Sequence, residues 1–210
     1  MSLITHRCAG RATAAEETDA VDGSMERDEF LTFIKGAILA LPQSLKAALR
    51  VAEDPDIPDE GRTLVAGAVI HWLSGTNTIP GVRGGAMALV DDVLVLMLAV
   101  ERAQTLAPDA PERMLQHAPE LCETLSEDLS LTRKYFGHGM SVIEQAMPRL
   151  TKLKHLGRTA EQCVKDEASA TMLYEELLSA LVDFDPTPDS VARELKEIDS
   201  VVEDLRKKAN

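Results

Sequence analysis

Residues 63–100 have the sequence TLVAGAVIHWLSGTNTIPGVRGGAMALVDDVLVLMLAV, which stands apart from the rest of the chain by its lack of charge. Its charged side chains are Arg83, Asp91 and Asp92, although charged residues make up 27% of the protein. The pattern predicts an Ala-rich helix that ends near Gly75, a loop rich in Gly and Pro, and a helix over residues 86–100. A helix that is apolar on nearly every side has to be buried, so this stretch predicts the centre of the domain.

The same stretch does not predict a simple membrane span. Residues 63–82 carry no charge, yet they include His71, Asn77 and Pro80 and are interrupted at Gly75. A spanning helix needs about 20 consecutive, predominantly apolar residues whose backbone groups are all paired. We therefore expect these residues to form a protein core.

The composition favours an all-α fold, which we expect to be a multi-helix domain of orthogonal or bundle type with a C-terminal helical extension. Aromatic residues make up only 3% of the 210 residues, while Ala, Leu and Val are plentiful. Strands are enriched in aromatic and β-branched residues and helices in Ala and Leu, so no strand is expected. The net charge of −13 makes nucleic acid an improbable partner, because phosphates would be repelled by most of the surface.

Helix-capping residues, glycines and prolines divide the chain into four expected segments. They are a disordered tail over residues 1–23, a helical core over 24–106, a helical extension packed on the core over 107–185, and an amphipathic helix over 186–210. Helix starts are expected at Ser24, Pro58, the capping pair Thr159 and Gln162, and the pair Thr187 and Pro188. Helix ends or bends are expected at Pro42, Gly137 and Gly157.

No catalytic residue and no cofactor is predicted, and whether the protein is an enzyme stays open. The chain has no pattern of a serine hydrolase, zinc protease or phosphate-binding loop. Cys8, Cys122 and Cys163 are far apart, so free thiols are expected instead of a disulfide framework or a zinc site. The first 23 residues lack the apolar core of a secretion signal, which predicts a cytoplasmic protein that is not secreted.

Asp91 and Asp92 lie inside an apolar helix, where a charge needs a partner. One interpretation is a cation site or a proton-handling carboxylate, with His71 as a further ligand. The alternative, which we favour on sequence alone, is structural: one aspartate caps the loop over residues 74–85 and pairs with Arg83, the other meets solvent, and His71 is satisfied by a carbonyl. Neighbouring residues point about 100° apart on a helix, so the two acids need other ligands to share an ion.

A basic segment over residues 131–158 carries a net charge of +5, whereas residues 159–210 sum to −7. It could bind an anionic partner such as a membrane surface, or it could dock on the acidic C-terminal helices of the same chain, which we favour. Its basic residues are Arg133, Lys134, Arg149, Lys152, Lys154 and Arg158.

The last expected helix has apolar residues at spacings of four and three, as in a short coiled-coil strand. There are two interpretations of this apolar stripe: the helix packs back on its own domain, or it self-associates or binds a partner helix. The residues concerned are Val191, Leu195, Ile198, Val202 and Leu205.

Residues 66–96, AGAVIHWLSGTNTIPGVRGGAMALVDDVLVL, resemble the core motif of the bacterial YkvA family, a helical domain of unknown function. The pair Ile79-Pro80 and the pair Asp91-Asp92 match the motif, and the resemblance covers roughly residues 40–105. Gly75 stands where the family has a proline, and Asn77 where it has an acid. The resemblance implies a fold and a lineage and no particular activity. Because some members of the family are assigned to membranes, it also implies that peripheral membrane association is one of the possible functions.

Three functional hypotheses follow. The leading one is a non-enzymatic interaction or assembly module that binds a protein partner, or a second copy, through the C-terminal helix. The second is a peripheral protein at the inner face of the membrane that uses the basic segment. The third is a helical protein that binds a metal or a small molecule at His71, Asp91 and Asp92.

Overall fold

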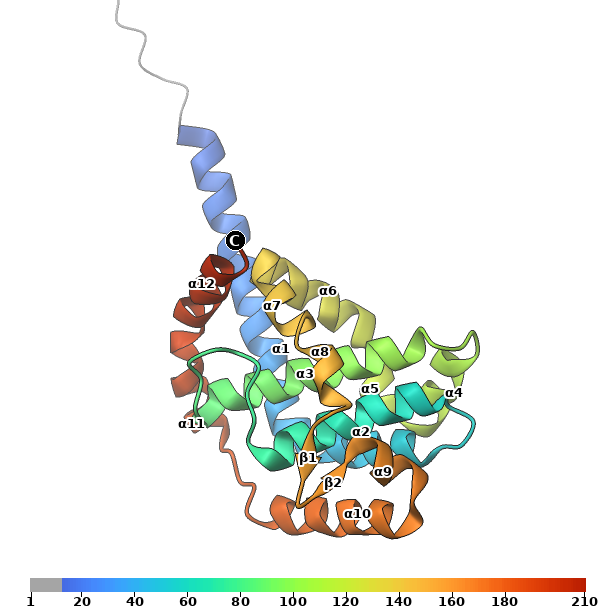
Figure 1. The fold of residues 1–210 in the computed structure, drawn as a ribbon. Helices are drawn as coiled ribbons and strands as arrows, with labels where there is room; N and C mark the ends of the chain where they lie inside the picture. The colour runs from blue at the N-terminus through green and yellow to red at the C-terminus, as the bar shows by residue number, and fades with distance from the viewer. Residues whose placement is uncertain (1–12) are drawn as a thin grey trace, which may run out of the picture.

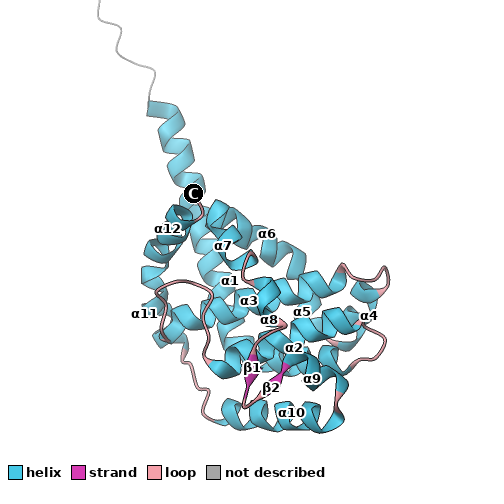
Figure 2. Ribbon diagram, in the orientation of Figure 1, coloured by secondary structure: helices cyan, strands magenta, loops and turns pink. Residues whose placement is uncertain are grey.

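The structure is a computed structural model that describes the backbone of residues 13–210 and the side chains of residues 25–210. Of the expected tail, residues 1–12 lie outside this described part. In chain order the elements are α1 (Thr13–Glu53), α2 (Asp59–Ser74), α3 (Gly85–Gln104), α4 (Ala110–His117), α5 (Pro119–Cys122), α6 (Leu125–Phe136), η1 (Gly137–Gly139), α7 (Met140–Glu144), α8 (Met147–Leu150), β1 (Lys154–His155), β2 (Arg158–Thr159), α9 (Ala160–Lys165), α10 (Glu167–Val182), α11 (Pro188–Glu194), η2 (Leu195–Glu197) and α12 (Ile198–Lys208). The all-α prediction is confirmed, and Figure 2 shows one small hairpin among the helices.

Three helices build the centre of the molecule. α2 packs along α3, and both contact α1, whose N-terminal turns extend beyond the rest of the molecule (Figure 1). Val65 and Val69 of α2 and Leu94 and Val100 of α3 have no exposed surface, which confirms residues 63–100 as the buried centre. None of the described helices is both long and apolar enough to cross a membrane.

α1 differs from its prediction at both ends. It already runs from Thr13, before the expected start at Ser24, and it continues through Pro42 to Glu53. A proline inside a helix costs about 3 kcal/mol through a lost hydrogen bond and a clash. Leu41 and Leu45 on either side of it are fully buried, and such burial stabilises by about 1.5–3 kcal/mol per side chain. Packing therefore keeps the helix continuous where the local signal predicts a stop.

The chain after α7 also departs from expectation. The single helix predicted to close at Gly157 is divided into α7 and α8, and a hairpin of β1 and β2 follows. Leu156 and Gly157 form its two-residue turn with φ of 46° and 86°, so Gly157 serves a hairpin and not a helix end. The capping pair Thr159 and Gln162 is confirmed, although its helix stops at Lys165 and α10 begins after a new cap at Asp166.

The C-terminal segment packs back on the domain. Thr187 caps α11 and Pro188 opens it as predicted, but the expected single helix is divided into α11, η2 and α12. All five residues of its apolar stripe are buried at 2% exposure or less, so in this structure they contact the protein's own core: Val191, Leu195, Ile198, Val202 and Leu205. Asp199 fastens this segment further, because it accepts hydrogen bonds from Arg27 of α1 and Tyr135 of α6.

The N-terminus of α3 receives a side chain from α11. Helix ends leave backbone N–H groups without intrahelical partners. The N–H of Ala86 donates to Oε2 of Glu194 at 2.7 Å, so a carboxylate lies where the helix dipole is positive. This contact joins the C-terminal segment to the helix that carries Asp91 and Asp92.

We expect Glu194→Ala to lower the free energy of unfolding by about 1 kcal/mol, the usual cost of losing a helix cap. Urea unfolding measures this change. Glu197→Ala is the matched control, since Glu197 is also an exposed glutamate of this segment and makes no such contact with α3. An equal loss in both variants would contradict the capping role.

Gly67 allows a close approach between α2 and α8. A Cβ added at this position would lie 2.7 Å from the carbonyl oxygen of Leu150. Real Cβ atoms do not tolerate that distance to a backbone atom, so only glycine fits. The contact holds α8 against α2 one turn before His71.

We expect Gly67→Ala to lower the free energy of unfolding by about 2 kcal/mol, because a backbone segment has to move to admit the methyl group. Gly36→Ala in α1 is the matched control. A Cβ there meets nothing within 4 Å, so the better helix propensity of alanine should stabilise the protein by about 0.5–1 kcal/mol. Thermal and urea unfolding of the two variants should therefore change in opposite directions, and a shared sign would show that the close approach does not matter.

Candidate metal site at His71, Asp91 and Asp92

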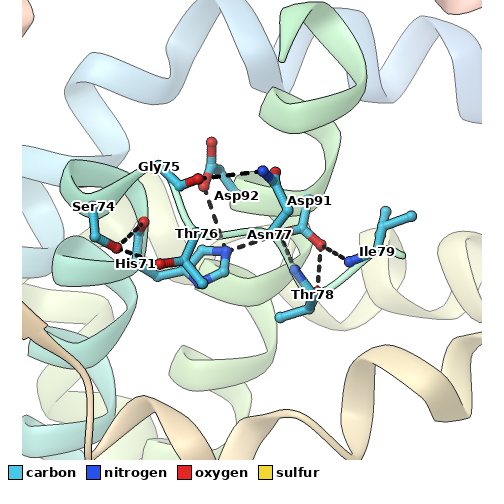
Figure 3. Close-up of polar contacts among 9 residues, drawn as sticks. All are labelled: His71, Ser74, Gly75, Thr76, Asn77, Thr78, Ile79, Asp91 and Asp92. Atoms are coloured by element: carbon cyan, nitrogen blue, oxygen red, sulfur yellow. Dashed lines mark hydrogen bonds and ion pairs between the residues drawn. The ribbon is translucent and has the colours of Figure 1, made fainter. Parts of the chain in front are cut away.

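Three side chains that could hold a metal meet where α2 and α3 face each other. His71 comes from the last turn of α2, Asp91 and Asp92 come from α3, and the loop between the two helices covers them (Figure 3). One ligand atom of each residue lies within 4.8 Å of the others. The sequence alone separates these residues by 20 positions, and helix packing brings them together.

Asp91 is fully buried and saturated with hydrogen bonds. Its Oδ1 accepts the N–H of Ile79 at 2.8 Å and the hydroxyl of Thr78, and its Oδ2 accepts the N–H of Thr78 at 2.9 Å. The expectation that one aspartate caps the loop is therefore confirmed. The expected pairing with Arg83 is wrong, because Arg83 is exposed and the loop's own backbone supplies the donors.

His71 contacts the same carboxylate. Its Nε2 lies 2.8 Å from Asp91 Oδ2, and the side chain is only 1% exposed. The expectation that a carbonyl satisfies this histidine is wrong, since its Nε2 faces a carboxylate. The hydroxyl of Ser74 donates to the His71 carbonyl and lies 2.7 Å from the Thr76 hydroxyl, which orders the turn after α2.

Asp92 lies beside His71 and Asp91 but has no hydrogen-bond donor among the described residues. Its side chain is 9% exposed, and His71 Nε2 lies 3.7 Å from Oδ1. Burial and, to a smaller extent, the negative charge of Asp91 together raise the pKa of Asp92 to about 8. The expectation that the second aspartate meets solvent therefore holds only in part, because 9% of its side chain is exposed.

The arrangement suits a divalent cation. Metal bonds to nitrogen and oxygen are about 2.1 Å long, so neighbouring ligand atoms on one ion lie about 3.0–3.5 Å apart. The two distances from His71 Nε2, 2.8 and 3.7 Å, lie close to this range. An imidazole with two carboxylates is a mixed nitrogen and oxygen donor set, of the kind that Zn²⁺, Mn²⁺ and Fe²⁺ accept. Consecutive residues of a helix point about 100° apart, so Asp91 and Asp92 need a further ligand to share an ion, and His71 of the facing helix is placed to supply it.

A cavity of about 300 Å³ adjoins His71. The loop residues Thr76 and Thr78 line one side, and Gln145 and Arg149 from the segment around α7 and α8 line the other. The site thus has an adjacent space in which a small ligand fits, and Arg149, which is exposed, gives that space a positive charge.

His117 and Glu120 lie away from this site, on α4 and α5, and Arg50 joins them by donating to the His117 carbonyl and to the Glu120 carboxylate. Among the motif residues of the resemblance, Ile79 is buried and contacts Asp91 through its N–H, while Pro80 lines the cavity beside His71.

The basic segment does not form one continuous patch of unpaired charge. Arg133 pairs with Glu101 and Glu144, Lys134 with Glu26, and Arg158 with Glu176. Of these ion pairs, the Arg158 pair reaches the acidic C-terminal part, on α10. The segment also docks on α12 without ion pairs, because Tyr135 donates to Asp199 and Arg206 donates to the carbonyls of Tyr135 and Phe136. The favoured expectation of docking on the C-terminal helices is therefore confirmed, although mostly through hydrogen bonds and packing instead of charge pairs. Arg149, Lys152 and Lys154 are exposed.

Sequence reasoning missed the donors that hold Asp91. Every residue except proline has a backbone N–H group, so the sequence does not show which of them donate to Asp91. It shows only that a buried carboxylate needs donors, and the structure identifies them as Thr78 and Ile79. No protein-family model, curated protein sequence or solved structure matches this chain. The resemblance to the YkvA family stays a prediction, and the functional argument rests on the residues of the site.

Proposed function

We propose that this protein binds a divalent metal ion through His71, Asp91 and Asp92. The observation that carries the proposal is Asp92, a carboxylate that is nine-tenths buried, accepts no hydrogen bond and faces a histidine and a second acid. A buried carboxylate without a partner is costly, and a cation is the partner that this donor set suits best. Asp91 alone would be explained by its role in the loop.

The three residues have different tasks in this proposal. Asp91 is fixed by the N–H groups of Thr78 and Ile79, so one of its oxygens is presented in a defined place. His71 offers Nε2 from the opposite helix, and Asp92 supplies the remaining negative charge. Two carboxylates and a neutral imidazole balance the charge of a divalent ion.

Three protein ligands leave coordination positions for water or a small ligand. When bound, a divalent metal lowers the pKa of a coordinated water or polarises a carbonyl or phosphoryl oxygen. The cavity beside His71 supports access by such a ligand, and its size is at the lower end for small-molecule sites, which begin at about 300 Å³.

The assembly and membrane hypotheses have less support. Burial of Val202, Leu205 and the rest of the apolar stripe removes the surface on which the assembly hypothesis depends. Pairing of Arg133, Lys134 and Arg158 reduces the charge that the basic segment offers to an anionic membrane.

Titration calorimetry of the metal-free full chain with Zn²⁺ and with Mn²⁺ tests the proposal. We expect one ion per chain for the wild type. Asp92→Asn should weaken binding at least about tenfold, since even residues that only support a ligand cost 10–100-fold. Asp183→Asn, the same change at an exposed aspartate, is the control and should bind as the wild type does. Absence of binding by the wild type, or unchanged affinity in Asp92→Asn, would refute the proposal.

A further inference from the structure

A second cleft lies between α1, α3 and the segment of α5 and α6, and none of the three candidate metal ligands lines it. Its volume is about 370 Å³. Most of its walls are apolar: Ala37 and Leu41 come from α1, Val93 and Met97 from α3, and Leu125 from α6. Its size and lining match those of small-molecule sites.

The cleft exists because α1 presents small residues there. Thr32, Gly36, Ala40 and Ser44 follow one another at four-residue spacing and therefore share one face of the helix. The hydroxyls of Thr32 and Ser44 donate to carbonyls of their own helix, at 2.8 and 3.3 Å. The side chains on this face of α1 are small and have few unpaired polar groups, so a space stays open between α1 and α6.

Two carboxylates line the cleft, and they differ in their partners. Glu120 is already paired, since Arg50 Nη2 lies 2.8 Å from each of its oxygens. Asp128 is half-buried and accepts from the Thr124 hydroxyl at 2.6 Å through Oδ2. Among the described side chains, no Lys or Arg forms an ion pair with Asp128. A carboxylate beside an apolar wall attracts a cation more strongly than one in open water does.

We infer that this cleft binds a small organic amine, with its ammonium group at Asp128 and its hydrocarbon part over Gly36 and Ala40 of α1. Two features select this class of ligand. The apolar walls favour a hydrocarbon body, and Asp128 is the cleft carboxylate that forms no ion pair with a Lys or Arg among the described side chains. The site is independent of the metal site, so either proposal can hold without the other.

Three probes with one phenylbutyl body and different head groups test the inference: 4-phenylbutylamine, 4-phenylbutanol and 5-phenylvalerate. Titration of the full chain, followed by calorimetry or by NMR shifts of α1 amides, compares their affinities at neutral pH. We expect the amine to bind at least about fivefold more tightly than the alcohol, and the carboxylate more weakly than both, as a charge-assisted hydrogen bond predicts. Equal affinities, or no binding of the amine, would overturn the inference.

Two variants locate the binding. Gly36→Leu should fill the cleft, because a Cβ at Gly36 meets nothing within 4 Å, and should weaken the amine and the alcohol alike by tenfold or more, on the order of the loss of one buried side-chain contact. Asp128→Asn should weaken the amine about fivefold and leave the alcohol unchanged. Gln43→Leu places the same leucine on α1 at an exposed position that does not line the cleft, and is the control. Amine binding that survives Gly36→Leu, or that Gln43→Leu weakens equally, contradicts this location.

Discussion

Asp91→Asn should lower the free energy of unfolding by about 3–5 kcal/mol, the range for removing one partner of a buried charged network. Oδ1 of Asp91 accepts from the Ile79 N–H and the Thr78 hydroxyl, and Oδ2 accepts from the Thr78 N–H and lies 2.8 Å from His71 Nε2. An amide has one acceptor and one donor group, so in either orientation its NH₂ faces donors. Urea unfolding at a single pH measures the loss.

Asp92→Asn is the matched control, because it makes the same change at the next residue. Asp92 accepts no hydrogen bond, so this variant should stay within about 1 kcal/mol of the wild type at pH 5–6. Hydrogen exchange gives a local readout: the amides of Thr78 and Ile79 should lose protection in Asp91→Asn and keep it in Asp92→Asn. Similar losses in both variants would mean that the loop does not depend on Asp91.

The fold could be predicted where a local pattern and tertiary packing agree. Gly75 ends α2 in a left-handed conformation, and Thr187 caps α11, as their residue types require. Prediction failed where packing outweighs the local signal. Pro42 lies inside α1 because buried leucines flank it, and Gly157 forms a hairpin turn although glycine also ends helices.

The residues of the candidate site could be predicted from the sequence, but their spatial arrangement and hydrogen bonds could not. An acidic pair in an apolar helix and a histidine one turn before Gly75 are visible in the sequence. Their shared location depends on how α2 and α3 pack, which no short motif encodes. The sequence also could not show which aspartate receives the loop's backbone donors, because the register of residues 76–80 against α3 decides that.

The metal-free protein should lose stability as the pH rises from 5 to 8, and Asp92 should be a main cause. Its pKa in the folded protein is about 8, against an ordinary value of 3.8. Below pH 4 the carboxyl is protonated in both states, and its favourable contribution is complete. Between pH 4 and 8 the unfolded chain releases this proton while the folded protein keeps it, so each step up in pH favours unfolding. Above pH 8 both states are ionised and the loss levels off.

The size of the effect follows from the width of this window. The slope reaches about 1.4 kcal/mol per pH unit, so between pH 5 and 8 the wild type should lose about 3–4 kcal/mol relative to Asp92→Asn. Urea unfolding of both proteins with a chelator present measures this difference, and the other titrating groups cancel because both proteins share them. Parallel pH profiles would show that Asp92 is ionised at neutral pH without a metal.

A bound metal should reverse the contribution of Asp92 to the pH dependence of stability. A metal ligand has to be deprotonated, so Zn²⁺ binding at pH 7 should release about one proton from Asp92. Calorimetry in buffers of different ionisation enthalpy counts that proton as the difference between the wild type and Asp92→Asn, because a proton from metal-bound water is common to both proteins. The difference should be about one proton at pH 7 and should fall towards zero at pH 9, where the carboxylate is already ionised. Asp183→Asn should release as many protons as the wild type. Equal proton release by the wild type and Asp92→Asn at pH 7 would assign the titration to another group and leave Asp92 outside the metal site.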